Sequence, residues 1–217
     1  MFEVDRLIGA ALAMALLVGS CGDGSEPRGP TTPDSGYLEV PGSVGIMRSV
    51  GAVEETDVHV AMLVGRGKAR LYFCGGAESY ATATRWFNVG WDGGEHVDFQ
   101  EQNWRVHAHL TVDGASGEVE LGDGVTRFFQ TELVAPATLA GLYEGKADCG
   151  RLGLIVSQAA KDALPTAQGA CADITEQPAQ LISPIAPINS EAGKIRVRKP
   201  GGGDATLLLQ AATLDPL

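Results

Sequence analysis

The stretch WRVHAHLTVDGASGEVELGDGVTRFF, Trp104–Phe129, decides the fold, because apolar and polar residues alternate along it with the period of a β-strand. From Trp104 to Val112 the apolar residues fall on one face of an extended chain and the polar residues on the other. Asp113-Gly114 and Asp123-Gly124 interrupt the alternation, and such pairs supply the positive φ that tight hairpins need. The stretch therefore predicts antiparallel strands joined by short turns.

The same pattern continues beyond Gly36. We expect strands near Val58–Val64, Ala69–Cys74, Thr82–Trp91, Trp104–Val112, Glu118–Leu121, Val125–Leu133, Arg151–Val156, Lys194–Lys199 and Ala205–Gln210. One helical turn is expected at Ser157–Leu164, and the proline-containing segment Glu176–Ile188 is expected to be an extended crossing. Because short turns join antiparallel neighbours, we predict an all-β antiparallel meander that closes into a small barrel or sandwich, with at most one short helix.

The charge of the chain excludes some classes of partner. The 217 residues carry a net charge of −11, and acidic and basic residues are mixed along the sequence. No basic face is therefore expected to release counterions from a nucleic acid, and none is expected to bind an anionic membrane surface. A membrane attachment would have to come from another feature.

The N-terminal segment carries such a feature. Leu7–Val18 is an unbroken run of apolar or small residues, too short to span a bilayer and of the length found in a secretory signal. The fifteen residues after Cys21, GDGSEPRGPTTPDSG, have nothing to bury and predict a flexible tether. Its root-mean-square reach is roughly 20 Å.

The quartet Val18-Gly19-Ser20-Cys21 resembles the lipobox of bacterial lipoproteins, an aliphatic residue and two small residues before a cysteine. The resemblance implies cleavage before Cys21, a diacylglycerol on its sulfur and an acyl chain such as palmitate on the new amino terminus. Two or three chains on one residue anchor a protein stably.

We therefore expect a signal peptide at 1–20, a lipidated cysteine and tether at 21–36, and a single β-rich domain at 37–217. The expected location is the bacterial cell envelope, with the membrane as a partner through the lipid on Cys21. Gly22 does not match the best-known retention signal, which favours the outer membrane.

The middle of the body resembles small β-meander modules of exported bacterial proteins that have no assigned role. The segments that carry this likeness are RWFNVGWDGGEHVDF, GEVELGDGVTRFF and AGLYEGK. The likeness implies a fold and no activity.

Three cysteines remain in what would be an oxidising compartment. Cys149 and Cys171 both adjoin glycines at the ends of one segment, whereas Cys74 follows a strand-like run. We predict a Cys149–Cys171 disulfide, which would stabilise the fold by about 3 kcal/mol. The sequence leaves the pairing of Cys74 with Cys149 open.

The polar face of Trp104–Val112 is the most suggestive chemical pattern. If Asp113-Gly114 is a two-residue turn, His109 lies opposite Glu118 and His107 lies opposite Glu120. Imidazoles and carboxylates in such an arrangement could converge on a divalent metal. The simpler interpretation is an exposed ladder of charged pairs, each contributing roughly 0.2–1 kcal/mol. His-x-His also occurs in cupins, but their glycine-rich lead-in and second histidine motif are absent.

Trp86 is the second candidate. It shares a strand face with Thr82, Thr84 and Asn88, so it is either packed under a second layer or presented to solvent. An exposed Trp among hydroxyls and amides would form a sugar-stacking surface. The expected ligand-binding residues are therefore Trp86, Arg105, His107 and His109.

Motifs for nucleotide binding and for serine nucleophiles are incomplete or missing. GLYEGKA is one residue short of the P-loop spacing, GRGKAR lacks the third glycine of a dinucleotide fingerprint, and no G-x-S-x-G occurs. We therefore expect no cofactor, and a non-enzymatic envelope lipoprotein with a binding or structural role and an envelope glycan or protein as partner. A carbohydrate- or peptide-binding module on the Trp86 face is the first alternative. A metal-dependent enzyme at the His107/His109 face is the second.

Overall fold

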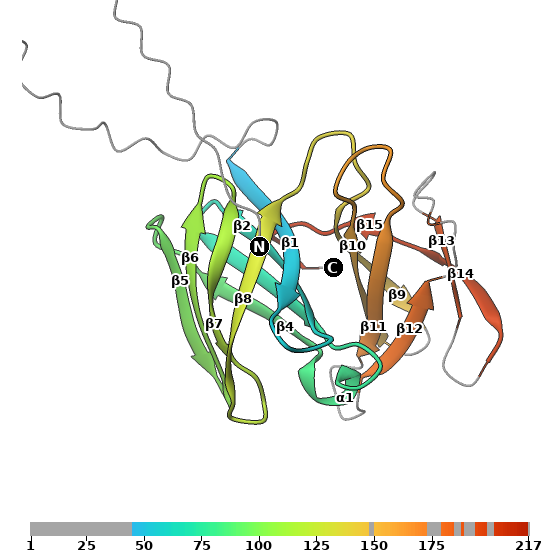
Figure 1. Cartoon of the computed structure of the whole chain (residues 1–217), viewed down its shortest axis with the longest axis horizontal. Helices are drawn as coiled ribbons and strands as arrows, with labels where there is room; N and C mark the ends of the chain where they lie inside the picture. The colour runs from blue at the N-terminus through green and yellow to red at the C-terminus, as the bar shows by residue number, and fades with distance from the viewer. Residues whose placement is uncertain are drawn as a thin grey trace, which may run out of the picture. The chain divides into compact units, whose positions relative to one another are not determined.

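The computed structural model describes residues 45–147, 150–172, 179–184, 188, 194–198 and 202–216. These residues belong to one compact unit, Tyr37–Leu217. Its strands form two antiparallel sheets, and the single helix among the described residues, α1 (Tyr80–Ala83), has four residues (Figure 1). The all-β antiparallel prediction is confirmed, and the sheets curl into two nearly closed, barrel-like shapes.

The first sheet has eight strands in the order β4-β3-β2-β1-β8-β7-β6-β5. Its strands are β1 (Ile46–Val53), β2 (His59–Gly65), β3 (Lys68–Cys74), β4 (Arg85–Gly90), β5 (His96–Glu101), β6 (Trp104–Thr111), β7 (Gly114–Glu120) and β8 (Thr126–Leu133). The two edge strands approach each other: Arg85 of β4 forms an ion pair with Glu101 of β5 at 2.8 Å, and the rings of Phe87 and Phe99 lie 4.9 Å apart. The sheet thus curls until its edges nearly meet.

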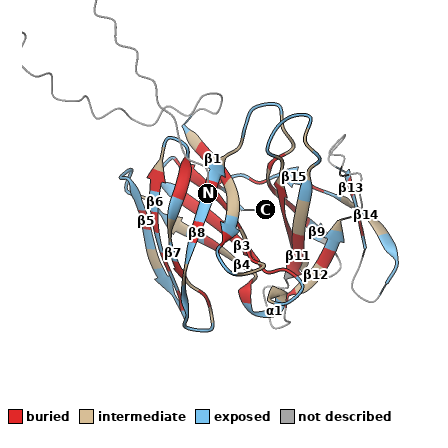
Figure 2. Ribbon diagram, in the orientation of Figure 1, coloured by how far each residue is buried: buried red, intermediate tan, exposed pale blue. Residues whose placement is uncertain are grey.

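Alternation along the strands fills the interior of this sheet. Along β6, Trp104, Val106, Ala108 and Leu110 are buried, and the residues between them are exposed (Figure 2). Trp104 lies 5.4 Å from Phe73 and 5.3 Å from Phe87, between ring centroids. These aromatic contacts form the centre of the core of the first sheet.

The second sheet has seven strands in the order β14-β13-β12-β11-β10-β9-β15. Its strands are β9 (Gly141–Ala147), β10 (Gly150–Ser157), β11 (Thr166–Ala172), β12 (Gln180–Pro184), β13 (Lys194–Arg198), β14 (Asp204–Leu208) and β15 (Gln210–Ala211). The edge strand β14 also contacts β9, next to the opposite edge. The curled sheet encloses a core of its own, made of Leu152, Leu154, Val156, Cys171, Ile182, Ile195, Val197 and Leu209.

A third apolar layer joins the two sheets. Strands β2 and β3 are buried on both faces, which explains their nearly continuous apolar sequences HVAMLVG and ARLYFC. Ala61, Leu63 and Tyr72 of the first sheet pack with Leu142, Ile155 and Ala170 of the second. After β15 the chain returns to this layer, where Ala212 and Leu214 are buried.

An ion-pair cluster lies in the same layer, and we call it the interlayer cluster: Arg70, Glu144, Arg151, Tyr72 and Trp86. Arg70 Nη1 donates to Glu144 Oε1 at 2.9 Å, and both side chains are 0% exposed. Arg151 Nη2 donates to the other oxygen of Glu144 at 2.8 Å. Two guanidinium groups from different sheets therefore converge on one buried carboxylate.

The predicted helix at Ser157–Leu164 is wrong. The register pairs Ser157 with Thr166, so the residues between them form the loop of the β10–β11 hairpin. Gln158 Nε2 donates to the carbonyl oxygens of Lys161 and Ala163, which holds the loop in a compact turn. Leu164 is 91% exposed and gives a helix no apolar face to bury.

Other predictions differ in extent. The hairpin predicted from Lys194 onward is present as β13 and β14. The extended crossing predicted for Glu176–Ile188 contains β12, which pairs with both β11 and β13. Strands β1, β5, β9 and β11 were not expected from the sequence.

Candidate functional site

Side chains of alternate residues form a regular grid on the outside of β5, β6, β7 and β8. We call this grid the outer polar face. Residues that lie opposite one another on neighbouring strands form three rows across it: His96, His109, Ser116 and Gln130; Asp98, His107, Glu118 and Phe128; and Gln100, Arg105, Glu120 and Thr126. Most of these side chains are exposed, because their apolar neighbours along each strand turn inward.

The β6–β7 register differs by two residues from the predicted one. His107 lies opposite Glu118, and His109 lies opposite Ser116. The turn is at Val112-Asp113, and Gly114 is the first residue of β7, with a φ of +147°. A Cβ at Gly114 would lie 2.0 Å from the carbonyl oxygen of Thr131, so only glycine fits at this position of β7. The turn therefore lies one residue before the predicted Asp113-Gly114 turn. A shift of two keeps the side chains of Trp104–Thr111 on their predicted faces. Val112, which was predicted on the apolar face, lies in the turn and is 67% exposed.

Histidines gather at the β5 end of this face. The rings of His96 and His107 stack with centroids 5.4 Å apart, and those of His96 and His109 lie 5.1 Å apart. His107 Nδ1 lies 2.5 Å from Asp98 Oδ1. Possible metal ligand atoms of His96, Asp98 and His107 all lie within 4.8 Å of one another.

The four predicted metal candidates are only partly brought together. His107 and His109 both lie beside His96, which the sequence interpretation did not include. Glu118 lies across β7 from Phe128, and Glu120 faces Arg105 at 3.8 Å. The histidine cluster therefore turns toward β5 and not toward the glutamates of β7.

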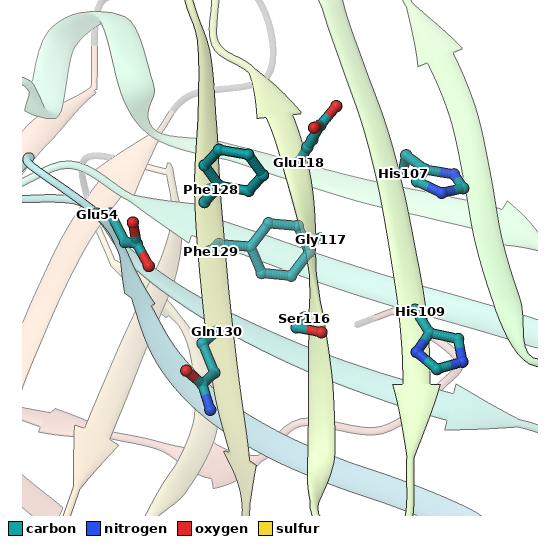
Figure 3. A pocket seen from close by; sticks show the side chains of 9 residues that line it. All are labelled: Glu54, His107, His109, Ser116, Gly117, Glu118, Phe128, Phe129 and Gln130. Carbon is teal, nitrogen blue, oxygen red and sulfur yellow. The ribbon is translucent and has the colours of Figure 1, made fainter.

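A shallow groove of about 600 Å³ runs over β6, β7 and β8. It is lined by Glu54, His107, His109, Ser116, Gly117, Glu118, Phe128, Phe129 and Gln130 (Figure 3). Phe128 is 58% exposed and stands beside Glu118 on the solvent side of the sheet. The groove thus offers an aromatic surface with carboxylate, amide, hydroxyl and imidazole groups around it.

Trp86 does not belong to this face. Its ring stacks on Tyr72 with centroids 4.2 Å apart, and the guanidinium carbons of Arg70 and Arg151 lie 4.4 Å and 4.2 Å from the ring centroid. Of the two positions predicted for Trp86, packing under a second layer is the one observed. Protein contacts occupy the indole, which differs from the exposed sugar platform that the alternative function required.

Arg105 lies on the outer polar face, in the row of Gln100 and Glu120 next to that of His107. Its ion pair with Glu120 connects β6 with β7, and both side chains retain exposure. Of the four predicted ligand-binding residues, Arg105, His107 and His109 therefore share one face, and Trp86 lies elsewhere.

The thiol of Cys74 is free and buried. Burial raises the pKa of Cys74 to about 12, although hydrogen bonds with Tyr72 and Gln168 partly oppose the shift. A thiol with this pKa is a poor nucleophile near neutral pH. Because Cys74 is free, the rival Cys74–Cys149 pairing is wrong. Cys21 and Cys149 lie outside the described residues.

A second polar cluster lies at the loop between β1 and β2. Burial raises the pKa of Asp57, but hydrogen bonds from the Ser79 hydroxyl and from the backbone N–H groups of Glu78 and Gly76 outweigh it, so the net pKa is lowered. Burial lowers the pKa of His59, and nearby Asp57 partly opposes this shift. Ser79 donates directly to Asp57, without a histidine between them. The cluster therefore holds the loop and lacks the order of a catalytic triad.

Sequence reasoning missed His96, Asp98, Phe128 and Glu54. The first two could have been found, because HVDFQE alternates polar and apolar residues directly after the Asp92-Gly93-Gly94 turn. Phe128 lies in the predicted strand Val125–Leu133, and the alternation about the buried Phe129 places it outward. Glu54 reaches the groove because its backbone N–H bonds the carbonyl oxygen of Phe128, a contact that the sequence does not signal.

Among the described residues, no helix has the length and apolar character needed to cross a membrane. Comparison of the chain with protein-family models, with curated proteins and with solved structures finds no match in any of the three.

Proposed function

We propose that this chain is a lipid-anchored protein of the bacterial envelope whose β-domain is a non-enzymatic binding module. The anchor is supported by the lipobox residues Val18-Gly19-Ser20-Cys21 and by the apolar run before them. The net charge of −11 makes attachment through a basic surface unfavourable, so the lipid on Cys21 carries the attachment. The mismatch of Gly22 with the best-known retention signal favours the outer membrane.

Lipidation is tested by expressing the full chain in a bacterium supplied with a labelled fatty acid. We expect label on the wild-type chain, its recovery with membranes, and a mature mass that begins at Cys21. Cys21→Ser should remove both label and membrane recovery, and Cys74→Ser, which changes a buried thiol, should leave both in place. An unlabelled soluble chain that retains Met1 would overturn this part of the proposal.

The groove on the outer polar face is the proposed binding surface, and exposed Phe128 is the observation that carries it. A protein usually buries a side chain of this size, and an exposed aromatic ring beside polar groups suits the apolar face of a sugar ring. Gln130 and Ser116 can hydrogen-bond sugar hydroxyls. Because Glu54 and Glu118 add negative charge, we propose a neutral glycan of the envelope as the ligand.

Co-sedimentation of the full chain with insoluble envelope polysaccharide tests this surface. Phe128→Ala should reduce the bound fraction several-fold, because it removes the stacking ring. Leu208→Ala is the matched control, since Leu208 is 69% exposed on β14, outside the groove, and its loss should change nothing. Equal binding by wild type and Phe128→Ala would refute the glycan surface. Binding to envelope proteins alone would favour a peptide ligand instead.

We also propose the Cys149–Cys171 disulfide. Its support is that Cys74 is free and that Cys171 lies on β11, opposite Leu152 of β10, the strand that follows Cys149 directly. Digestion without reductant should release one disulfide-linked peptide pair containing these two cysteines. A linked pair containing Cys74 would contradict the assignment.

A further inference from the structure

Two strands contribute the side chains that approach most closely at the rim of the groove. His96 and Asp98 alternate on β5, and His107 lies on β6 directly opposite Asp98. All three side chains are exposed, and their possible ligand atoms lie within 4.8 Å of one another. Three potential ligands therefore converge from a rigid two-strand ladder, which is a better support than a loop.

The donor set fits a first-row transition metal. Imidazole nitrogens and a carboxylate oxygen are common ligands of zinc, and imidazole also suits copper and nickel. A tetrahedral ion with bonds of about 2.0–2.2 Å holds its ligand atoms about 3.3–3.6 Å apart. The most widely separated ligand atoms must therefore approach by roughly 1.2–1.5 Å from 4.8 Å, and Nδ1 of His107 and Oδ1 of Asp98 must separate by roughly 1 Å from 2.5 Å. Exposed rotamers permit both changes.

The contact between His107 and Asp98 already holds two of the ligand groups side by side. Nδ1 of His107 lies 2.5 Å from Oδ1 of Asp98, and a metal ion would bind these two residues in place of their present contact. The stacking of His96 on His107 at an interplanar angle of 14° restricts the second imidazole as well.

We propose that His96, Asp98 and His107 bind a divalent transition-metal ion, with zinc as the reference case. His109 is not a ligand in this assignment, because it lies outside the converging trio and its Nε2 is 4.0 Å from Glu95. Three protein ligands leave a coordination position open to water or to a donor group of a bound molecule. The metal would thus add a coordination point at the rim of the groove, and it does so whether or not the groove binds a glycan.

Equilibrium dialysis of the full chain, without an affinity tag, against micromolar to millimolar ZnCl₂ tests the site. We expect one zinc ion per chain. His96→Ala, Asp98→Asn and His107→Ala should each weaken binding by about tenfold or more. Magnesium, which prefers octahedral oxygen ligands, should not compete.

Two control variants make the ligand assignment sharp. His109→Ala removes the same kind of side chain from the same face of β6, and Gln100→Ala removes a polar side chain next to the site on β5. Both should bind zinc as wild type does, and circular dichroism should show that all variants fold. Three results would overturn the proposal: no zinc bound by wild type, unchanged binding by His107→Ala, or a loss in His109→Ala equal to that in His107→Ala.

Discussion

Two clusters of polar and charged side chains, one between the two sheets and one on the outside of the first sheet, differ in their access to water. In the interlayer cluster, Arg70 and Glu144 are 0% exposed, and the carboxylate receives a second guanidinium from Arg151. On the outer polar face, His107 and Asp98 approach just as closely, yet their side chains are 58% and 55% exposed. A close contact between a basic group and a carboxylate thus occurs once in the buried layer between the sheets and once at the solvent-exposed surface.

The difference in exposure distinguishes a cluster that stabilises the fold from a surface that is available to a ligand. A buried charge must find its partner within the protein, so the interlayer cluster fixes how the two sheets pack and has little left to offer a ligand. An exposed pair gains little from its contact, because water solvates both groups well. Side chains of the outer polar face can therefore exchange their present partners for a ligand at small cost.

The largest effect is expected for Glu144→Gln. Removal of this charge leaves Arg70 buried without its counterion, and we expect the free energy of unfolding to fall by about 3–5 kcal/mol. Glu118→Gln on the outer polar face is the matched control and should change stability by less than about 0.5 kcal/mol. Urea unfolding of both variants measures the contrast. Similar losses in the two variants would erase the distinction between the clusters.

Gly153→Ala tests the packing around the interlayer cluster. A Cβ at this position would lie 2.4 Å from Cζ of Tyr72 and 2.8 Å from Cζ2 of Trp86. We expect a loss of about 1–3 kcal/mol, because two stacked rings must move. At Gly90 an added Cβ meets nothing within 4 Å, so Gly90→Ala should leave thermal unfolding almost unchanged. A neutral Gly153→Ala would mean that the layer is loosely packed.

His59 lies between the two settings, half-buried at the start of β2. Because burial lowers its folded-state pKa below 6.5, the unfolded chain binds the proton first as the pH falls. The free energy of unfolding should therefore fall as the pH drops below about 6.5, and this fall should level off at the folded-state pKa of His59. Asp57, whose pKa is lowered, acts in a separate window below 3.8. Unfolding measured between about pH 8 and pH 5 should decline less steeply in His59→Gln than in wild type. Parallel declines would contradict the burial of His59.

The smallest effect is expected for Arg105 and Glu120 of the outer polar face. Their charged groups lie 3.8 Å apart and remain in contact with water. A double-mutant cycle with Arg105→Ala and Glu120→Ala should give a coupling of about 0.2–1 kcal/mol that shrinks in high salt. A coupling that is larger and independent of salt would show that this face is more rigid than its exposure suggests.

Three of the four strands that carry the outer polar face, β6, β7 and β8, could be predicted from their sequence pattern, whereas β5 was not expected. Alternation from Trp104 to Phe129 predicted these three strands and, apart from Val112, the buried and exposed faces of β6. The register was wrong by two residues, because Asp113-Gly114 has the composition of a turn. Gly114 does not form the turn. It lies in β7, where the backbone of Thr131 is too close for a side chain, and this close packing of β7 against β8 cannot be read from the local sequence.

The interlayer cluster could not be predicted. Arg70 and Glu144 are 74 residues apart, and each looks like an ordinary charge within a strand. Their pairing depends on how two separate sheets pack, which no local pattern encodes. For the same reason the sequence left Trp86 between two positions, and only the second sheet decides between them.

The central claim is that ligands bind the outer polar face and that the interlayer cluster is structural. Two-dimensional amide NMR spectra of the full chain in detergent, recorded before and after addition of neutral oligosaccharides, test it most directly. The account predicts chemical-shift changes confined to residues around Phe128, Gly117 and Gln130. Changes centred on the second sheet, or no changes with every oligosaccharide, would contradict it.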